Sequence, residues 1–151
     1  MIGVDDQGAG FTFVEKKEIE RVKIGYLYVS VKDTDKSVQY YCDVFGAKLL
    51  WRMKKFGSVV AALQFNTDDP ILLLNDHHPP PRTELIFLVE DAKKSQEKLQ
   101  KRGARNLSPP LEAATGIAAV FTDLDENPLA ITDHSKLEAF LKSIERERKK
   151  G

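Results

Sequence analysis

Cysteine is almost missing from this chain. Cys42 is the only one among 151 residues, which excludes an internal disulfide and favours a reduced, intracellular setting. Excess charge is missing as well, because 23 Lys and Arg residues balance 23 Asp and Glu residues. Nucleic acids and anionic membranes select an excess of positive charge, so neither is expected as a partner.

Long apolar runs are also missing. None approaches the roughly 20 residues that span a bilayer. Residues 1–6 have neither the basic start nor the apolar region of a secretory signal. We therefore expect a soluble, cytoplasmic protein.

The most informative feature present is an internal repeat. Val31-Lys32-Asp33 returns as Val89-Glu90-Asp91, an offset of 89 − 31 = 58. The apolar run 59–63 returns at 117–121, and the turn 68–71 returns at 126–129. A fixed offset of this length indicates one supersecondary unit used twice. We place the two modules at about residues 24–81 and 82–134.

Each module is predicted to contain a strand, a helix and three further strands. Apolar alternation favours a first strand over 21–32. The spacing of Val38, Tyr41, Cys42 and Phe45 predicts the apolar face of a helix over 35–45. Asp33 or Thr34 is expected to cap that helix, and Gly46 to end it. The other expected strands are 48–53, 59–65, 71–75, 84–89, 108–111, 116–122 and 129–132, and the second helix is 92–102.

Three segments connect or flank the modules. Pro79-Pro80-Pro81 forms a stiff joint between them. Residues 1–20 are expected to form an N-terminal arm, followed by the tandem domain 21–134. A final helix and charged tail occupy 135–151, with Ser135 and Glu138 as an expected capping box and an apolar stripe of Leu137, Phe140, Leu141 and Ile144.

Several short motifs carry a resemblance to a known family. The stretch from Ile24 to Gly46, with Val31-Lys32-Asp33, Ser37 and the pair Tyr40-Tyr41, resembles the opening of the vicinal-oxygen-chelate superfamily. The turn Asp123-Leu124-Asp125-Glu126-Asn127 is similar to that family's closing turn, with Leu124 in place of proline and Glu126 in place of glycine. This superfamily includes glyoxalase I, extradiol dioxygenases and bleomycin-resistance proteins. The resemblance implies an α+β fold in which two βαβββ modules form paired curved sheets around a cup, with a C-terminal helix added.

The same resemblance implies four positions for metal ligands, one on the first and one on the last strand of each module. Carried onto this chain they are Tyr26, Leu72, Glu84 and Ala130. Only Glu84 is a good ligand for a divalent ion, since a phenol ionises near pH 10 and aliphatic groups cannot bind metal. We therefore expect no metal and no cofactor.

The preferred hypothesis is a metal-free binder of a small organic molecule. Tyr26, Tyr28, Trp51 and Glu84 are the expected ligand-binding residues, with Glu84 as the one fixed charge in an aromatic cup. No catalytic residue is assigned. A homodimer is expected, because related two-module chains often share a cup between subunits, and residues 11–20 offer a clasping arm.

Two alternatives stay open. One is a metal-dependent lyase, isomerase or dioxygenase whose metal site has moved to Glu84, His134 and one of His77 or His78. The other is an interaction module without a ligand. Asp123 and Asp125 are expected to shape a turn, and Cys42 to be an inert thiol on a helix face.

Overall fold

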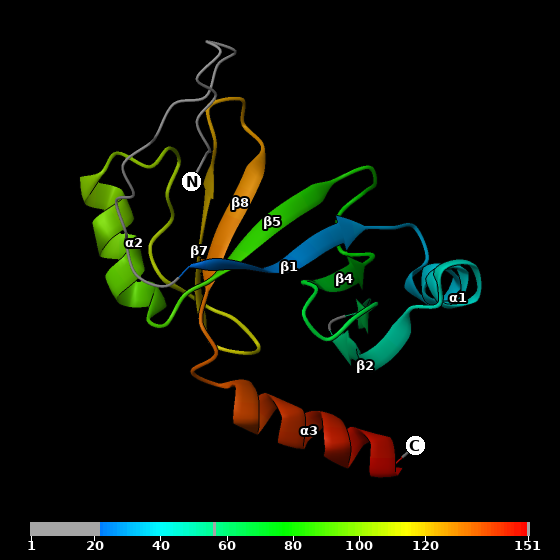
Figure 1. Ribbon diagram of the computed structural model, residues 1–151. Helices are drawn as coiled ribbons and strands as arrows, with labels where there is room; N and C mark the ends of the chain where they lie inside the picture. Colours follow the sequence, from blue (N-terminus) through cyan, green and yellow to red (C-terminus); the bar gives the residue numbers. More distant parts are fainter. Residues whose placement is uncertain (1–21, 56, 151) are drawn as a thin grey trace, which may run out of the picture.

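The computed structural model describes residues 22–55 and 57–150, and the expected N-terminal arm lies outside these residues. The chain folds as α+β, with eight strands in one mixed sheet and three helices (Figure 1). None of the helices in the described ranges is long and apolar enough to cross a membrane.

Both modules have the predicted order of strand, helix and three strands. Module one consists of β1 (Lys23–Ser30), α1 (Thr34–Phe45), β2 (Lys48–Lys55), β3 (Ser58–Gln64) and β4 (Ile71–Asn75). Module two consists of β5 (Thr83–Leu88), α2 (Ala92–Lys101), β6 (Leu111–Glu112), β7 (Ile117–Thr122) and β8 (Pro128–Thr132). The final helix is α3 (Leu137–Lys150).

The two modules join edge to edge in a single continuous sheet. The strand order is β2-β3-β4-β1-β5-β8-β7-β6, so the antiparallel pair β1–β5 lies at the centre. Within each module the first strand pairs in parallel with the last, β1 with β4 and β5 with β8. Parallel partners need a crossover connection, which here contains the helix.

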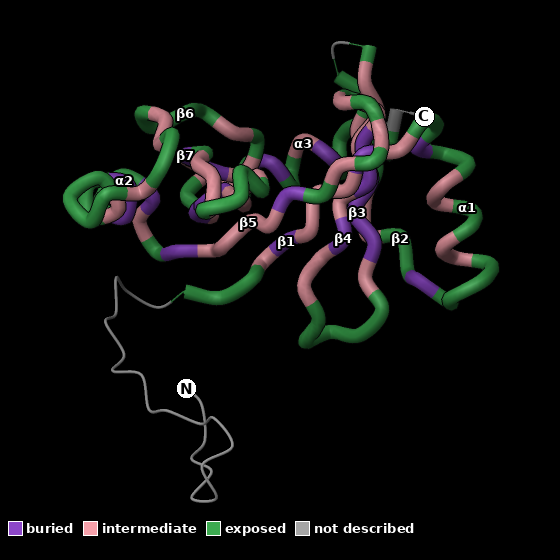
Figure 2. The backbone as a smooth tube through the Cα atoms, turned by 90° about the horizontal axis from the view of Figure 1, so that it is seen from above, coloured by how far each residue is buried: buried purple, intermediate pink, exposed green. Residues whose placement is uncertain are grey.

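Each module has its own small core beneath its helix. α1 lies against β3 and β4, and α2 against β7 and β8. Figure 1 shows these helices on opposite sides of the molecule, with α3 running beneath the strands. Figure 2 shows buried residues gathered in the strands, whereas α1 is mostly half-buried or exposed. The buried core residues are Ala47, Leu63, Leu72 and Leu74 in module one, and Val89, Ala92, Ala119 and Ile131 in module two.

The caps of α1 confirm the local prediction. The Asp33 carboxylate accepts a hydrogen bond from the Lys36 N–H, and its repeat partner Asp91 accepts one from Lys94. Gly46 ends α1 with φ +72°, a left-handed conformation that glycine adopts without strain.

The repeat offset changes within each module, which corrects the alignment expected from the sequence. Tyr28 pairs with Leu73, and Ile86 pairs with Ala130, so 86 − 28 = 58 but 130 − 73 = 57. The loop before the last strand explains the difference, since it has six residues in module one (65–70) and five in module two (123–127). The structural equivalent of Ala130 is therefore Leu73 and not Leu72.

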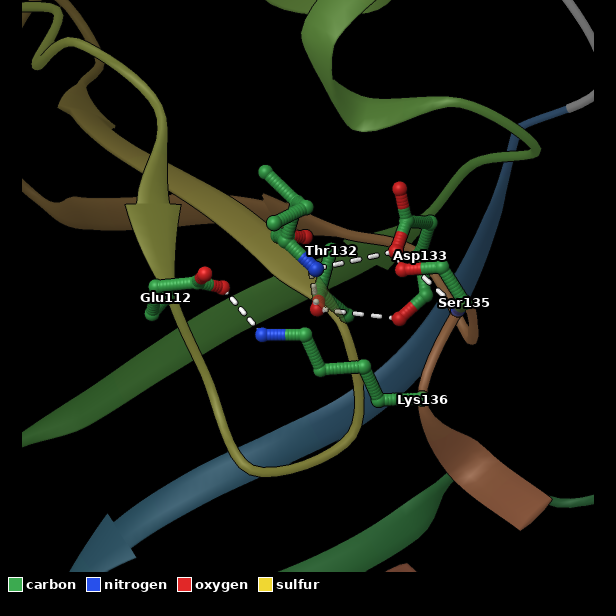
Figure 3. A network of polar contacts seen from close by, with 6 residues as sticks. Glu112, Thr132, Asp133, Ser135 and Lys136 are labelled. Atoms are coloured by element: carbon green, nitrogen blue, oxygen red, sulfur yellow. Dashed lines mark hydrogen bonds and ion pairs between the residues drawn. The ribbon is translucent and has the colours of Figure 1, made fainter. Parts of the chain in front are cut away.

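Asp133 lies at the junction of module two and α3 (Figure 3). Its carboxylate accepts hydrogen bonds from the N–H groups of Ala92, Ile117 and Ser135 and from the Ser135 hydroxyl, at 2.7–3.2 Å. A methyl group on Gly116 would lie 2.3 Å from Asp133, which explains the glycine. One carboxylate thus connects β7, α2 and the start of α3.

Two local expectations are wrong. Ser135 donates its hydroxyl hydrogen to Asp133, so it does not form the capping box with Glu138. Phe45 is 57% exposed and packs edge-on against Phe65, so only the other three residues of its predicted helix face contact the core. The physical reason is that Phe45 is the last residue of α1, where its ring meets Phe65, the residue after β3.

Asp133 and Asp76 form a matched pair for testing stability, because Asp76 is the repeat equivalent and accepts a single hydrogen bond, from Val59. We expect Asp133→Ala to lower the free energy of unfolding by about 3 kcal/mol, since it leaves buried N–H groups without an acceptor, and Asp76→Ala by about 1 kcal/mol. Urea denaturation measures both values, and equal losses would contradict the central role of Asp133.

The effect of Asp133 should depend on pH. Burial raises the pKa of this carboxyl, but its hydrogen bonds outweigh burial and hold the pKa below its usual value of about 3.9. A lowered pKa in the folded state gives stability that is complete above the unfolded pKa and lost as pH falls through the folded pKa. The difference between wild type and Asp133→Ala should therefore narrow below about pH 4.

Candidate ligand-binding site

A cavity of about 270 Å³ lies on the sheet face opposite α1 and α2. We call this cavity the cup. Both modules and α3 contribute to it, so one chain is sufficient to form it. The lining residues are Tyr26, Tyr28, Trp51, Met53, Leu73, Glu84, Ile86, Ala113, Ala114, Thr115, Ala118, Val120, Ala130, Ile131, Thr132 and Phe140.

The four residues expected to bind a ligand all line the cup. Tyr26 and Tyr28 alternate along β1, which places them on one face of the sheet. Tyr28 lies directly opposite Glu84 across the β1–β5 pair, and Tyr26 lies opposite Ile86. The pairing therefore brings phenol groups from module one beside the carboxylate of module two, and ligand binding by these residues stays a prediction.

Tyr26 contacts His134, the second residue after β8. Its phenol oxygen lies 2.6 Å from Nε2 of His134, with the two rings edge to face. Burial lowers the pKa of His134, and nearby Lys23 lowers it further. A lowered pKa favours the neutral imidazole, in which either the phenol or the imidazole donates the hydrogen that the other accepts. No local sequence pattern indicates this contact, because 108 residues separate the two positions.

Glu84 is a largely buried carboxylate with only 9% of its surface exposed. Burial raises its pKa, and the Arg82 guanidinium counteracts part of this rise. The closest approach of the two charged groups is 3.7 Å, between Arg82 Nη2 and Glu84 Oε2. That distance is too long for a hydrogen bond, so Arg82 balances the charge without occupying the oxygen atoms of Glu84.

The helix α3 supplies a wall that the sequence did not indicate. Phe140 is buried and packs edge to face on Trp51 of β2, with ring centroids 4.9 Å apart. Since α3 follows β8 of module two and contacts β2 of module one, it bridges both halves of the sheet. An apolar stripe predicts that a helix is packed, but it does not predict which surface the helix covers.

We call the four positions at which the family holds metal ligands the corners of the cup. One of the four residues expected at these corners does not face the cup. Leu72 is 8% exposed and belongs to the core beneath α1, whereas its neighbour Leu73 lines the cavity. Adjacent strand residues point to opposite faces, so the one-residue change in repeat offset moves the corner from Leu72 to Leu73. The cup corners are thus Tyr26, Leu73, Glu84 and Ala130.

This donor set does not fit a catalytic divalent metal ion. One carboxylate and one phenol stand at corners where at least three N or O ligands are needed, and the two aliphatic side chains cannot bind metal. Across residues 22–55 and 57–150, no three His, Cys, Asp or Glu side chains are grouped so that they could hold a metal ion. A relocated site at Glu84, His134 and His77 or His78 is therefore not formed by these residues.

The remaining candidates have local structural roles. The rings of His77 and His78 contact each other, with centroids 4.5 Å apart. Asp123 accepts hydrogen bonds from the N–H groups of Asp125 and Asn127, which confirms the expected turn. Glu126, at the position where glycine is usual, keeps a left-handed conformation with φ +64°. Cys42 packs against the core of module one.

These features define a class of protein: a duplicated βαβββ chain with a cup between its two modules. The sequence model of the Glyoxalase/Bleomycin resistance protein/Dioxygenase superfamily matches residues 23–131, most of the chain. The chain belongs to this superfamily. No curated protein matches the chain by sequence.

Solved structures share the fold at low sequence identity. Methylmalonyl-CoA epimerase from Mycobacterium tuberculosis is 16% identical with a TM-score of 0.65, over 77% of this chain and 90% of that one. A hypothetical protein from Bacillus halodurans is 12% identical with a TM-score of 0.63, over 76% and 95%. A variant of methylmalonyl-CoA epimerase from Streptomyces coelicolor, in complex with 2-nitronate-propionyl-CoA, is 16% identical with a TM-score of 0.62, over 75% and 94%.

The corrected corner assignment predicts which substitutions would build a metal site. Tyr26→His, Leu73→Gln and Ala130→Glu together, with native Glu84, should bind Ni²⁺ or Zn²⁺, because four N or O ligands would then converge. Titration calorimetry measures this affinity. The matched control carries Leu72→Gln in place of Leu73→Gln and should bind metal more weakly and be less stable, since it places an amide in the core. Equal metal affinity in both variants would contradict the assignment.

Proposed function

We propose that this protein binds a small organic molecule in the cup and that it does so without a metal ion. The main support for this proposal is the chemistry of the four corner residues. Only Glu84 among them is a good ligand for a divalent cation. Where the family holds a metal ion, this chain has an apolar and aromatic surface with one carboxyl group, that of Glu84. Such a lining is typical of pockets that bury most of a small ligand.

The size and walls of the cup support this proposal over an interaction module. A volume of about 270 Å³ lies near the lower end of the range for ligand pockets, so the ligand is a small molecule or one end of a larger one. Trp51 and Phe140 enclose one side, and the short residues Ala118 and Ala130 leave space on the other. An interaction module needs no such hollow.

The first test combines metal analysis with a ligand screen on protein purified without a histidine tag. We expect well under one equivalent of Ni, Zn, Fe or Mn per chain, and no change in melting temperature with a chelator. In a screen of small aromatic compounds, a binder at 100 times its dissociation constant should add about 2.7 kcal/mol of stability. One equivalent of metal, removed by the chelator together with stability, would overturn the proposal.

Variants connect a positive result of this screen to the cup. Phe140→Ala removes one wall and should weaken binding of a screened compound about tenfold, because apolar contact area is lost. Leu124→Ala is the matched control, since Leu124 lies in the turn before β8 and is 79% exposed. An equal effect of both substitutions would place binding elsewhere.

We also propose that the protein forms a homodimer. Residues of both modules line the cup within one chain, so the proposed dimer does not depend on a shared cup. The proposed contact is a group of exposed apolar residues near α1 and the neighbouring strands, because contiguous apolar patches often mark interfaces. Sedimentation showing only monomer at micromolar concentration would contradict it. The group consists of Tyr40, Val44, Phe45, Leu49 and Phe65.

A further inference from the structure

The cup has an electrostatic character that restricts the chemistry of its ligand. Among the described residues that line the cavity, Glu84 is the only charged one, and none of them is lysine or arginine. A carboxylate in a largely apolar cavity raises the local preference for cations over neutral molecules and anions, because water that would screen it is excluded.

The oxygen atoms of Glu84 remain available for a ligand. Arg82 approaches no closer than 3.7 Å, beyond hydrogen-bonding distance. Burial raises the pKa of Glu84, as expected for a carboxyl group with little water around it. A cation in the cup would supply the missing partner, and an ammonium N–H would form a charge-assisted hydrogen bond.

The aromatic walls favour the same kind of ligand. Tyr26, Tyr28, Trp51 and Phe140 all line the cup together with Glu84. A cation held over an aromatic ring gains about 0.5–2 kcal/mol, and most with tryptophan. Such rings also accommodate the apolar skeleton that carries the cation.

We propose that the natural ligand of the cup is an organic ammonium ion with an apolar or aromatic skeleton. Its cationic head lies between the Glu84 carboxylate and the aromatic rings, and its skeleton lies along Ala118, Val120 and Ala130 of module two. This inference rests on the proposed binding function and adds the charge and class of the ligand.

An anionic ligand is the strongest rival. Arg82 lies beside Glu84, and its Nη1 atom is buried without a hydrogen-bond partner in the described part of the chain. However, Arg82 does not line the cup, so an anion there would meet Glu84 first. The geometry therefore favours the cation, and the anion is one arm of the test.

The test uses three probes that share a phenylalkyl skeleton and differ in charge: phenethylammonium, phenethyl alcohol and hydrocinnamate. Titration calorimetry at neutral pH with the full chain should show phenethylammonium binding at least about tenfold more tightly than the alcohol, with hydrocinnamate weakest. Glu84→Gln should reduce the ammonium affinity about tenfold and change the alcohol affinity less than about twofold.

Glu97→Gln is the matched control, because Glu97 is exposed on α2 and does not line the cup. It should leave all three affinities unchanged. A second variant, Trp51→Leu, should weaken the ammonium more than the alcohol, since it removes a cation–π contact as well as apolar area. Circular dichroism confirms that each variant is folded before titration.

The possible results separate this inference from the proposed function. If the alcohol or hydrocinnamate binds as tightly as the ammonium, or if Glu84→Gln has no effect, the ammonium inference is overturned and small-molecule binding stands. If none of the three probes binds at millimolar concentration, both are overturned. Ammonium selectivity that disappears in Glu84→Gln and persists in Glu97→Gln supports the inference.

Discussion

The antiparallel pairing of β1 with β5 is the constraint on which the rest of the structure depends. Each module pairs its own strands internally, and this one ladder joins the two halves of the sheet. The register places Tyr28 opposite Glu84, so groups from both modules stand on one face. A slip of one residue would exchange them with core residues beneath the helices. The cup therefore exists because this register is fixed.

The duplicated fold carries different chemistry in its two halves. Tyr26 and Glu84 are repeat equivalents, but one is a neutral phenol bound to His134 and the other is a buried carboxylate beside Arg82. At the last strands the equivalents are Leu73 and Ala130, both without polar groups. A scaffold with four equivalent corners has thus become an asymmetric pocket with one negative side.

Much of the fold could be predicted from the sequence, because local signals agreed with the repeat. Helix ends at Asp33 and Gly46 and the turn at Asp123 follow from side-chain chemistry within a few residues. Prediction failed at Leu72, because Pro70 and Pro128 align in sequence although the loop before β8 is one residue shorter. Contacts between distant residues, such as Tyr26 with His134 and Trp51 with Phe140, leave no periodic signal.

The helix α3 lies outside the part of the chain that matches the superfamily model. The family match ends at residue 131, and the helix that closes the cup begins at Leu137. Phe140 therefore lies outside the region that the family model matches, although it forms a wall of the pocket. The shape of the cup can therefore change through substitutions in α3 alone, without disturbing the duplicated sheet.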